Sequence, residues 1–108
     1  MDLLVTTDWL AAHLHDPDLR VFDCSVRLVP DPAVQYRVED CRVEYRASHV
    51  PGAGYIDLHN ELSDKGTQLR FMAPTPEAFA RAMSAYGVGD GTRVVLYAKS
   101  TWYWAMRV

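Results

Sequence analysis

The feature that most constrains the fold of this chain is a short apolar run, Val-Val-Leu, at residues 94–96. The turn-forming pair Asp90-Gly91 precedes it, and small and polar residues follow it. Such a run is typical of a strand covered on both faces, as in a parallel sheet. In open α/β sheets, ligands bind at the carboxyl ends of the strands. We therefore expect a strand over residues 92–97. If the domain has a ligand-binding site, we expect its base to be formed by the loop of Ala98, Lys99, Ser100, Thr101 and Trp102.

The composition is that of a soluble globular protein of one domain at most. Its 108 residues are 49% apolar and 23% charged, with a net charge of −3 and scattered basic residues. These values argue against nucleic acid as a partner. No apolar run approaches the roughly 20 residues that cross a bilayer, and the amino terminus lacks a basic region. Because two cysteines do not make a disulfide framework, we expect a cytoplasmic, reducing location and no membrane partner.

Helical and extended patterns alternate along the chain, which predicts an α/β fold. A helix should follow the capping hydroxyls of Thr6 and Thr7 and end before Pro17. A second should begin at Thr75-Pro76 and end at Gly87. Strands are expected over residues 19–24, 55–58 and 92–97, and the core face of the second helix over Phe79, Ala82, Met83 and Tyr86. This order predicts a mainly parallel sheet flanked by helices.

Two segments depart from this alternation. Residues 25–48 carry prolines and charges of both signs, and we expect a long loop with a solvated, structural role rather than a functional one. Residues 102–108 begin a helix of about two turns that no glycine, asparagine or proline ends. Isolated helices shorter than roughly 12–15 residues are marginal in water. Residues 1–108 are therefore expected to form a single domain that is incomplete at its carboxyl end.

Several motifs in order resemble the rhodanese family of sulfurtransferases. More narrowly, they resemble the amino-terminal half of its tandem members, the thiosulfate and 3-mercaptopyruvate sulfurtransferases. The resemblance runs along essentially the whole chain, at residues 5–10, 45–53, 55–58, 61–64, 74–79, 87–91 and 104–108. The segment YRASHVPGA at residues 45–53 is similar to the family's Gly-His-Ile-Pro-Gly-Ala signature, which implies a structural turn at His49, Pro51, Gly52 and Ala53.

The resemblance also implies a role for the loop after the last strand. Single-domain and carboxy-terminal members carry a cysteine there, whose thiolate takes the sulfane sulfur as a persulfide. Loop amides and a helix amino terminus stabilise such an anion. The matching residue here is Ala98, which cannot act as a nucleophile. The resemblance therefore implies that this chain alone transfers no sulfur and that the reactive cysteine lies in a second rhodanese-like domain.

The two cysteines that are present offer weaker candidates. Cys24 ends a strand beside Asp23, whose charge would raise the pKa of the thiol, so a buried structural cysteine is favoured. Cys41 lies among Arg37, Arg42 and Arg46, which would favour a thiolate. The spacing from Cys41 to Arg46 is one residue short of a phosphatase loop. An incidental exposed thiol is therefore favoured at Cys41, with a reactive thiol as the lesser alternative.

The remaining candidates are histidines and aromatic residues. His13, His15, His49 and His59 do not have metal-ligand spacing, so we expect no metal and no cofactor, with His49 fixing the geometry of its turn. Trp102, Tyr103 and Trp104 either pack on the sheet or form an apolar surface that a partner domain covers, and we favour the second alternative. Arg107 either pairs with an acid across that interface or caps the helix.

Three hypotheses follow. In the first, the chain is the non-catalytic first half of a sulfurtransferase and shapes one wall of an active site. Its partner is then a second rhodanese-like domain, with a small sulfur-donor anion as the ligand of the full-length protein. In the second, the chain is a stand-alone binding module, alone or as a homo-oligomer, that recognises a partner or an anion through residues 98–102. The third is an enzyme that uses Cys41.

Overall fold

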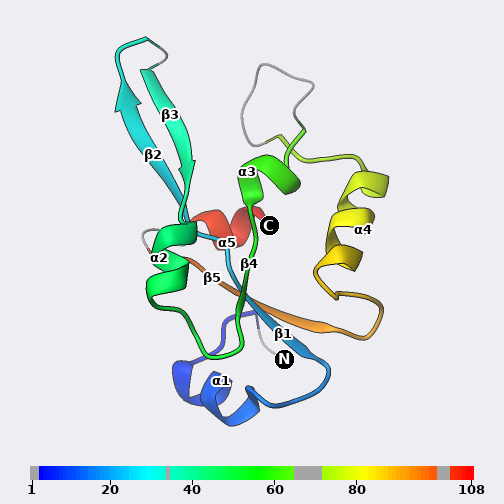
Figure 1. Cartoon of the computed structure of the whole chain (residues 1–108). Coiled ribbons are helices and arrows are strands. Elements are labelled where there is room, and N and C mark those ends of the chain that lie inside the picture. Colours follow the sequence, from blue (N-terminus) through cyan, green and yellow to red (C-terminus); the bar gives the residue numbers. More distant parts are fainter. Residues whose placement is uncertain (1–2, 34, 65–71, 100–102) are drawn as a thin grey trace.

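The structure, a computed structural model, describes residues 3–33, 35–64, 72–99 and 103–108. Figure 1 shows a small sheet with helices around it and a projecting pair of strands. The elements in chain order are α1 (Thr7–His13), β1 (Leu19–Asp23), β2 (Val26–Asp31), β3 (Gln35–Asp40), α2 (Arg42–Ala47), β4 (Gly54–Tyr55), α3 (Leu58–Glu61), α4 (Pro76–Ala85), β5 (Arg93–Tyr97) and α5 (Tyr103–Arg107).

The sheet is parallel, as the sequence predicts. In the described part of the chain, its strand order is β4-β1-β5. Strand β1 pairs with β5 from Leu19↔Arg93 to Asp23↔Tyr97, and with β4 only at Phe22 and Asp23. The strand expected over residues 92–97 is therefore present as β5. It lies beside β1 at one edge of this sheet, and only Val95 among its residues is fully buried.

Helices cover both faces of the sheet, because successive side chains of a strand point to opposite sides. Phe22 of β1 joins one apolar cluster, against which Met83 of α4 and Tyr86, directly after α4, pack. Val21 joins the other, against which Trp9 and Leu10 of α1 pack. The α/β fold of a mainly parallel sheet flanked by helices is confirmed. Phe79, expected on the core face of α4, is instead 40% exposed.

The predicted helix boundaries rest on local capping contacts. Thr6 Oγ1 accepts a hydrogen bond from the Trp9 amide at 3.0 Å, and Thr75 Oγ1 accepts one from Ala78 at 3.2 Å. Gly87 has a φ of 81°, the left-handed conformation that ends α4. None of the helices in the described segments has the length and apolarity that crossing a bilayer requires.

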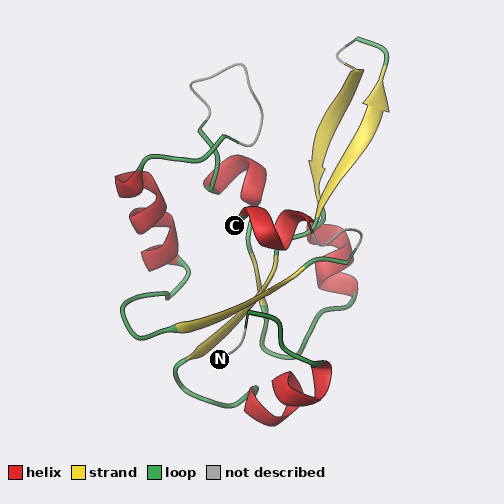
Figure 2. Cartoon of the chain, turned by 180° about the vertical axis from the view of Figure 1, so that it is seen from behind, coloured by secondary structure: helices red, strands yellow, loops and turns green. Residues whose placement is uncertain are grey.

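The prediction of a long loop over residues 25–48 is wrong. The segment folds into the antiparallel hairpin β2–β3 followed by α2, and the hairpin extends away from the sheet (Figures 1 and 2). Its charges, which suggested a loop, pair across the strands: Arg27 lies opposite Glu39, and their side chains form an ion pair at 3.1 Å. Pro30 is tolerated because a two-stranded ribbon leaves one edge of each strand unpaired.

Candidate functional site

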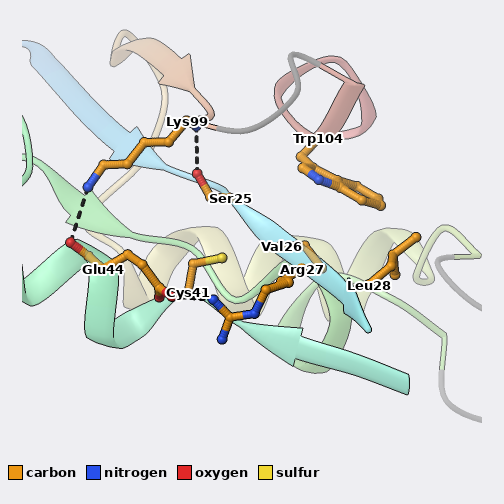
Figure 3. A pocket seen from close by; sticks show the side chains of 8 residues that line it. All are labelled: Ser25, Val26, Arg27, Leu28, Cys41, Glu44, Lys99 and Trp104. Carbon is orange, nitrogen blue, oxygen red and sulfur yellow. Dashed lines mark hydrogen bonds and ion pairs between the residues drawn. The ribbon is translucent and has the colours of Figure 1, made fainter. Parts of the chain in front are cut away.

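A pocket of about 460 Å³ lies where β1 and β5 end and the hairpin begins (Figure 3). Ligands bind at the carboxyl ends of the strands in open α/β sheets, so the pocket forms where a site is expected. Of the predicted loop, Lys99 lines it, whereas Ser100, Thr101 and Trp102 lie outside the described residues. The lining residues are Ser25, Val26, Arg27, Leu28, Cys41, Glu44, Lys99 and Trp104.

The ammonium group of Lys99 contacts other segments of the chain. Its ammonium group donates hydrogen bonds to the carbonyls of Glu44, at 3.1 Å, and of Ser48, both near the carboxyl end of α2. The Glu44 carbonyl also accepts from the Ser48 amide at 3.0 Å, so the ammonium is a second donor at this end of the helix, where a cation is favourable. The ammonium also lies 3.9 Å from the buried carboxylate of Asp23, and the Lys99 amide donates to Ser25 Oγ at 2.8 Å. Lys99 therefore fastens the loop after β5 to α2 and β1.

The second cation of the pocket, Arg27, is also paired. Its guanidinium donates to Glu39 Oε1 at 3.1 Å and to Glu44 Oε1. The hydrogen bonds from Arg27 hold the pKa of both carboxyl groups below their usual range. Both acids are therefore ionised at neutral pH, so two carboxylates face the single positive charge of Arg27 at this side of the pocket.

A buried tyrosine joins the segments that border the pocket. The Tyr55 hydroxyl donates to the Ser25 carbonyl at 2.6 Å and accepts from the Cys41 amide at 2.9 Å. Tyr55 is 7% exposed, so burial raises the pKa of its hydroxyl, which remains protonated and able to donate. The end of β1 and the beginning of α2 are thereby held at a fixed separation.

Relatives with the same architecture are found among known proteins, although no family model matches the chain. Thiosulfate/3-mercaptopyruvate sulfurtransferase 2 of Arabidopsis thaliana is 36% identical over 97% of the chain. The 3-mercaptopyruvate sulfurtransferase of Escherichia coli (strain K12) is 34% identical over 95% of it. The crystal structure of SseA from Escherichia coli, described as a rhodanese fold, matches 92% of the chain with a TM-score of 0.71 and 33% identity.

The chain belongs to the rhodanese family. It spans about a third of the proteins it matches: 29% of the Arabidopsis thaliana relative, 34% of the Escherichia coli one and 36% of the SseA chain.

Within this rhodanese domain, Ala98 directly follows β5 and is half-buried. On one side of it, Tyr97 accepts hydrogen bonds from Cys24 through its carbonyl, and on the other side Lys99 is held by Ser25. The backbone on both sides of this position is therefore fixed by Cys24 and Ser25, directly after β1, while its side chain is a single methyl group.

Cys24 is a buried structural cysteine, as predicted. It is 0% exposed, and its thiol donates to the Tyr97 carbonyl at 3.2 Å. Burial, reinforced by the charge of Asp23, raises the pKa of the thiol to about 12. A thiol that stays protonated at neutral pH is a poor nucleophile.

The environment of Cys41 differs from the prediction. The residue is 8% exposed rather than an exposed thiol, and burial followed by the charge of Glu44 raises the pKa of its thiol. Two of the three neighbouring arginines are engaged elsewhere, since Arg42 lies 3.5 Å from Asp57 and Arg37 lies 3.3 Å from Glu39. Cys41 nevertheless lines the same pocket as Lys99, which sequence spacing did not indicate.

The turn over residues 49–53 is held by local contacts. The ring of His49 stacks on Tyr45 at 4.1 Å, and its Nδ1 lies 2.6 Å from the Tyr45 carbonyl. The Tyr45 hydroxyl donates to the carbonyl of Ala53, which is buried. Gly52, which follows the exposed Pro51, has a φ of 79° that favours glycine. These contacts join His49 and Ala53 to Tyr45 at the end of α2, and Gly52 turns the chain between them.

Two further residues singled out in the sequence, Trp104 and Arg107, have described contacts within the domain. Within the described residues, no group of three or more histidine, cysteine, aspartate or glutamate side chains could hold a metal ion. Trp104 is half-buried and packs against the core while also lining the pocket. Arg107 donates to the Leu62 carbonyl at 3.0 Å, beside the end of α3.

Sequence reasoning missed five of the residues that line the pocket: Ser25, Val26, Arg27, Leu28 and Glu44. Two segments rich in strand-forming residues, 26–29 and 35–38, flank the turn signal Pro30-Asp31-Pro32, and this pattern could have revealed the hairpin.

Proposed function

We propose that the chain is the non-catalytic half of a two-domain sulfurtransferase and forms one wall of its active site. In this proposal, the cysteine that carries sulfur belongs to a second rhodanese-like domain, at the interface with the first. Its thiolate attacks the sulfane sulfur of a donor such as thiosulfate, the S–S bond breaks, and sulfite leaves. Cyanide then removes the sulfur as thiocyanate and restores the thiolate.

The observation that carries this proposal is Ala98 at the end of β5. Two further observations support it: both thiols of the chain are buried with raised pKa values, and the relatives extend well beyond the matched segment. A cytoplasmic location is part of the proposal, and the two unpaired cysteines support it. So is the interpretation of residues 1–108 as a single, incomplete domain.

The test measures thiosulfate-to-cyanide sulfur transfer. The 108-residue chain alone should be inactive. A chimera in which it replaces the matched segment of the Escherichia coli 3-mercaptopyruvate sulfurtransferase should be active. Activity of the chain alone that Cys41→Ser abolishes would overturn the proposal in favour of a Cys41 enzyme. An inactive chimera, together with a stop codon directly after Val108 in the gene, would favour the stand-alone binding module.

A further inference from the structure

The cations that line the pocket already have partners inside the protein. Lys99 is held by the carbonyls of α2, and Arg27 by Glu39 and Glu44. An incoming anion such as thiosulfate would therefore have to displace a carboxylate from Arg27 or a carbonyl from Lys99. It would also approach Glu44, whose lowered pKa keeps it negatively charged. The electrostatics of the pocket do not favour a small anion.

Apart from Ser25 and the charged residues, the lining is apolar or weakly polar. Figure 3 shows the indole of Trp104 on the opposite side of the pocket from Arg27 and Cys41, with Val26 and Leu28 along β2. The volume of about 460 Å³ is well above the roughly 150 Å³ of an apolar cavity that holds benzene. The pocket therefore has room for a large apolar side chain.

This apolar surface continues outward from the core. Val26 is buried in the core cluster, and Leu28, two residues later on the same face of β2, is 42% exposed. Opposite Leu28, Val38 of β3 packs on the cluster. An apolar residue that extends a core cluster into an open pocket, with paired charges at its rim, has the layout of an interface centre.

We infer that this pocket is the socket for an apolar side chain, of the leucine, methionine or phenylalanine kind, presented by the second rhodanese-like domain. The inference rests on the proposed function, and it adds where the two domains dock and by what chemistry. The relatives provide the occupant, because about two thirds of their length lies outside the segment that matches this chain. The ion pairs of Arg27 then form a rim that excludes water from the contact.

The test uses the chimera with the substitution Leu28→Asp and the matched control Val43→Asp. Val43 is also apolar and 73% exposed, but it lies on α2 away from the pocket lining. Leu28→Asp should lower kcat/KM at least tenfold and separate thermal unfolding into two transitions, because a carboxylate cannot replace the apolar contact. Val43→Asp should stay within twofold of the parent and unfold in one transition.

A second measurement separates docking from folding. In the 108-residue chain alone, Leu28→Asp should change the midpoint of thermal unfolding no more than Val43→Asp does, since both side chains are exposed. If Leu28→Asp lowers the midpoint of thermal unfolding as much in the isolated chain as in the chimera, the inference is overturned. If the chimera is active and Leu28→Asp changes neither its kcat/KM nor its thermal unfolding, the inference is also overturned, while the proposed function stands.

Two other occupants of the pocket, a small anion and a second copy of the chain, would each give a distinct result. Saturable binding of thiosulfate to the isolated chain, measured by calorimetry and abolished by Arg27→Gln, would assign the pocket to a small anion. A concentration-dependent dimer of the chain, seen in sedimentation and lost in Leu28→Asp, would assign it to a second copy. Either result would overturn the inference.

Discussion

The hydroxyl of Tyr55 offers the sharpest test of how this domain holds its pocket open. It bridges the Ser25 carbonyl at 2.6 Å and the Cys41 amide at 2.9 Å, and all three residues are buried. The substitution Tyr55→Phe removes the oxygen atom and keeps the packing of the ring. It therefore leaves one carbonyl and one amide without partners in a region that water reaches poorly.

The expected cost follows from these two groups. A buried polar group that loses its partner costs about 1–3 kcal/mol, so two groups with partial relaxation cost about 2–4 kcal/mol. Since about 1 kcal/mol shifts the midpoint of a domain of this size by about 4–8 °C, the midpoint should fall by about 8–32 °C. This is a large fraction of the stability of a small domain.

The assay is thermal unfolding followed by circular dichroism, with Tyr45→Phe as the control. Tyr45 donates to a single group, the Ala53 carbonyl, at a partly buried position. Its substitution should cost about 1 kcal/mol. If Tyr55→Phe costs no more than Tyr45→Phe, the hydroxyl does not bridge two buried groups, and the fixed separation of β1 and α2 would need another explanation.

Three further predictions concern single residues. Because the pKa of Cys24 is raised to about 12 from 9.0, its thiol stays protonated to a higher pH in the folded state than in the unfolded state. The contribution of this thiol to stability against urea should therefore be full below about pH 9 and should fall as the pH rises toward 12. Cys24→Ala should flatten this dependence. Gly87→Ala should cost about 1 kcal/mol in urea unfolding because its φ is 81°, whereas Gly89→Ala, where an added Cβ meets nothing within 4 Å, should be neutral. Lys99→Met should lower the unfolding midpoint slightly and increase hydrogen exchange at the amides near the end of α2, because Lys99 caps that helix.

The parts of this fold that could be predicted from sequence are those governed by neighbouring residues. Thr6 and Thr75 cap helices through amides three residues away, and Gly87 ends α4 through its own backbone conformation. The same holds for the apolar run of β5, whose composition indicates a strand before its neighbours are known. From the sequence, the candidate site could be placed only at the carboxyl end of that strand.

The pocket could not be predicted, because its contacts join distant residues. Lys99 reaches α2 across more than fifty residues, and Tyr55 links Ser25 to Cys41. The arginines near Cys41 in sequence favoured a thiolate, yet burial and Glu44 raise its pKa. A pKa depends on which charges and how much water surround the group in space, and sequence distance reports neither.

The sequence by itself determined the family, the parallel sheet and the absence of a thiol at position 98, because each of these depends on residue identity in a local pattern. The tertiary structure decided that residues 26–31 and 35–40 pair as a hairpin, that both thiols are buried, and that the cations of the pocket are paired within the chain. The physical reason is that hydrogen bonds and ion pairs between distant segments compete with solvent, and only the folded arrangement shows which of them form.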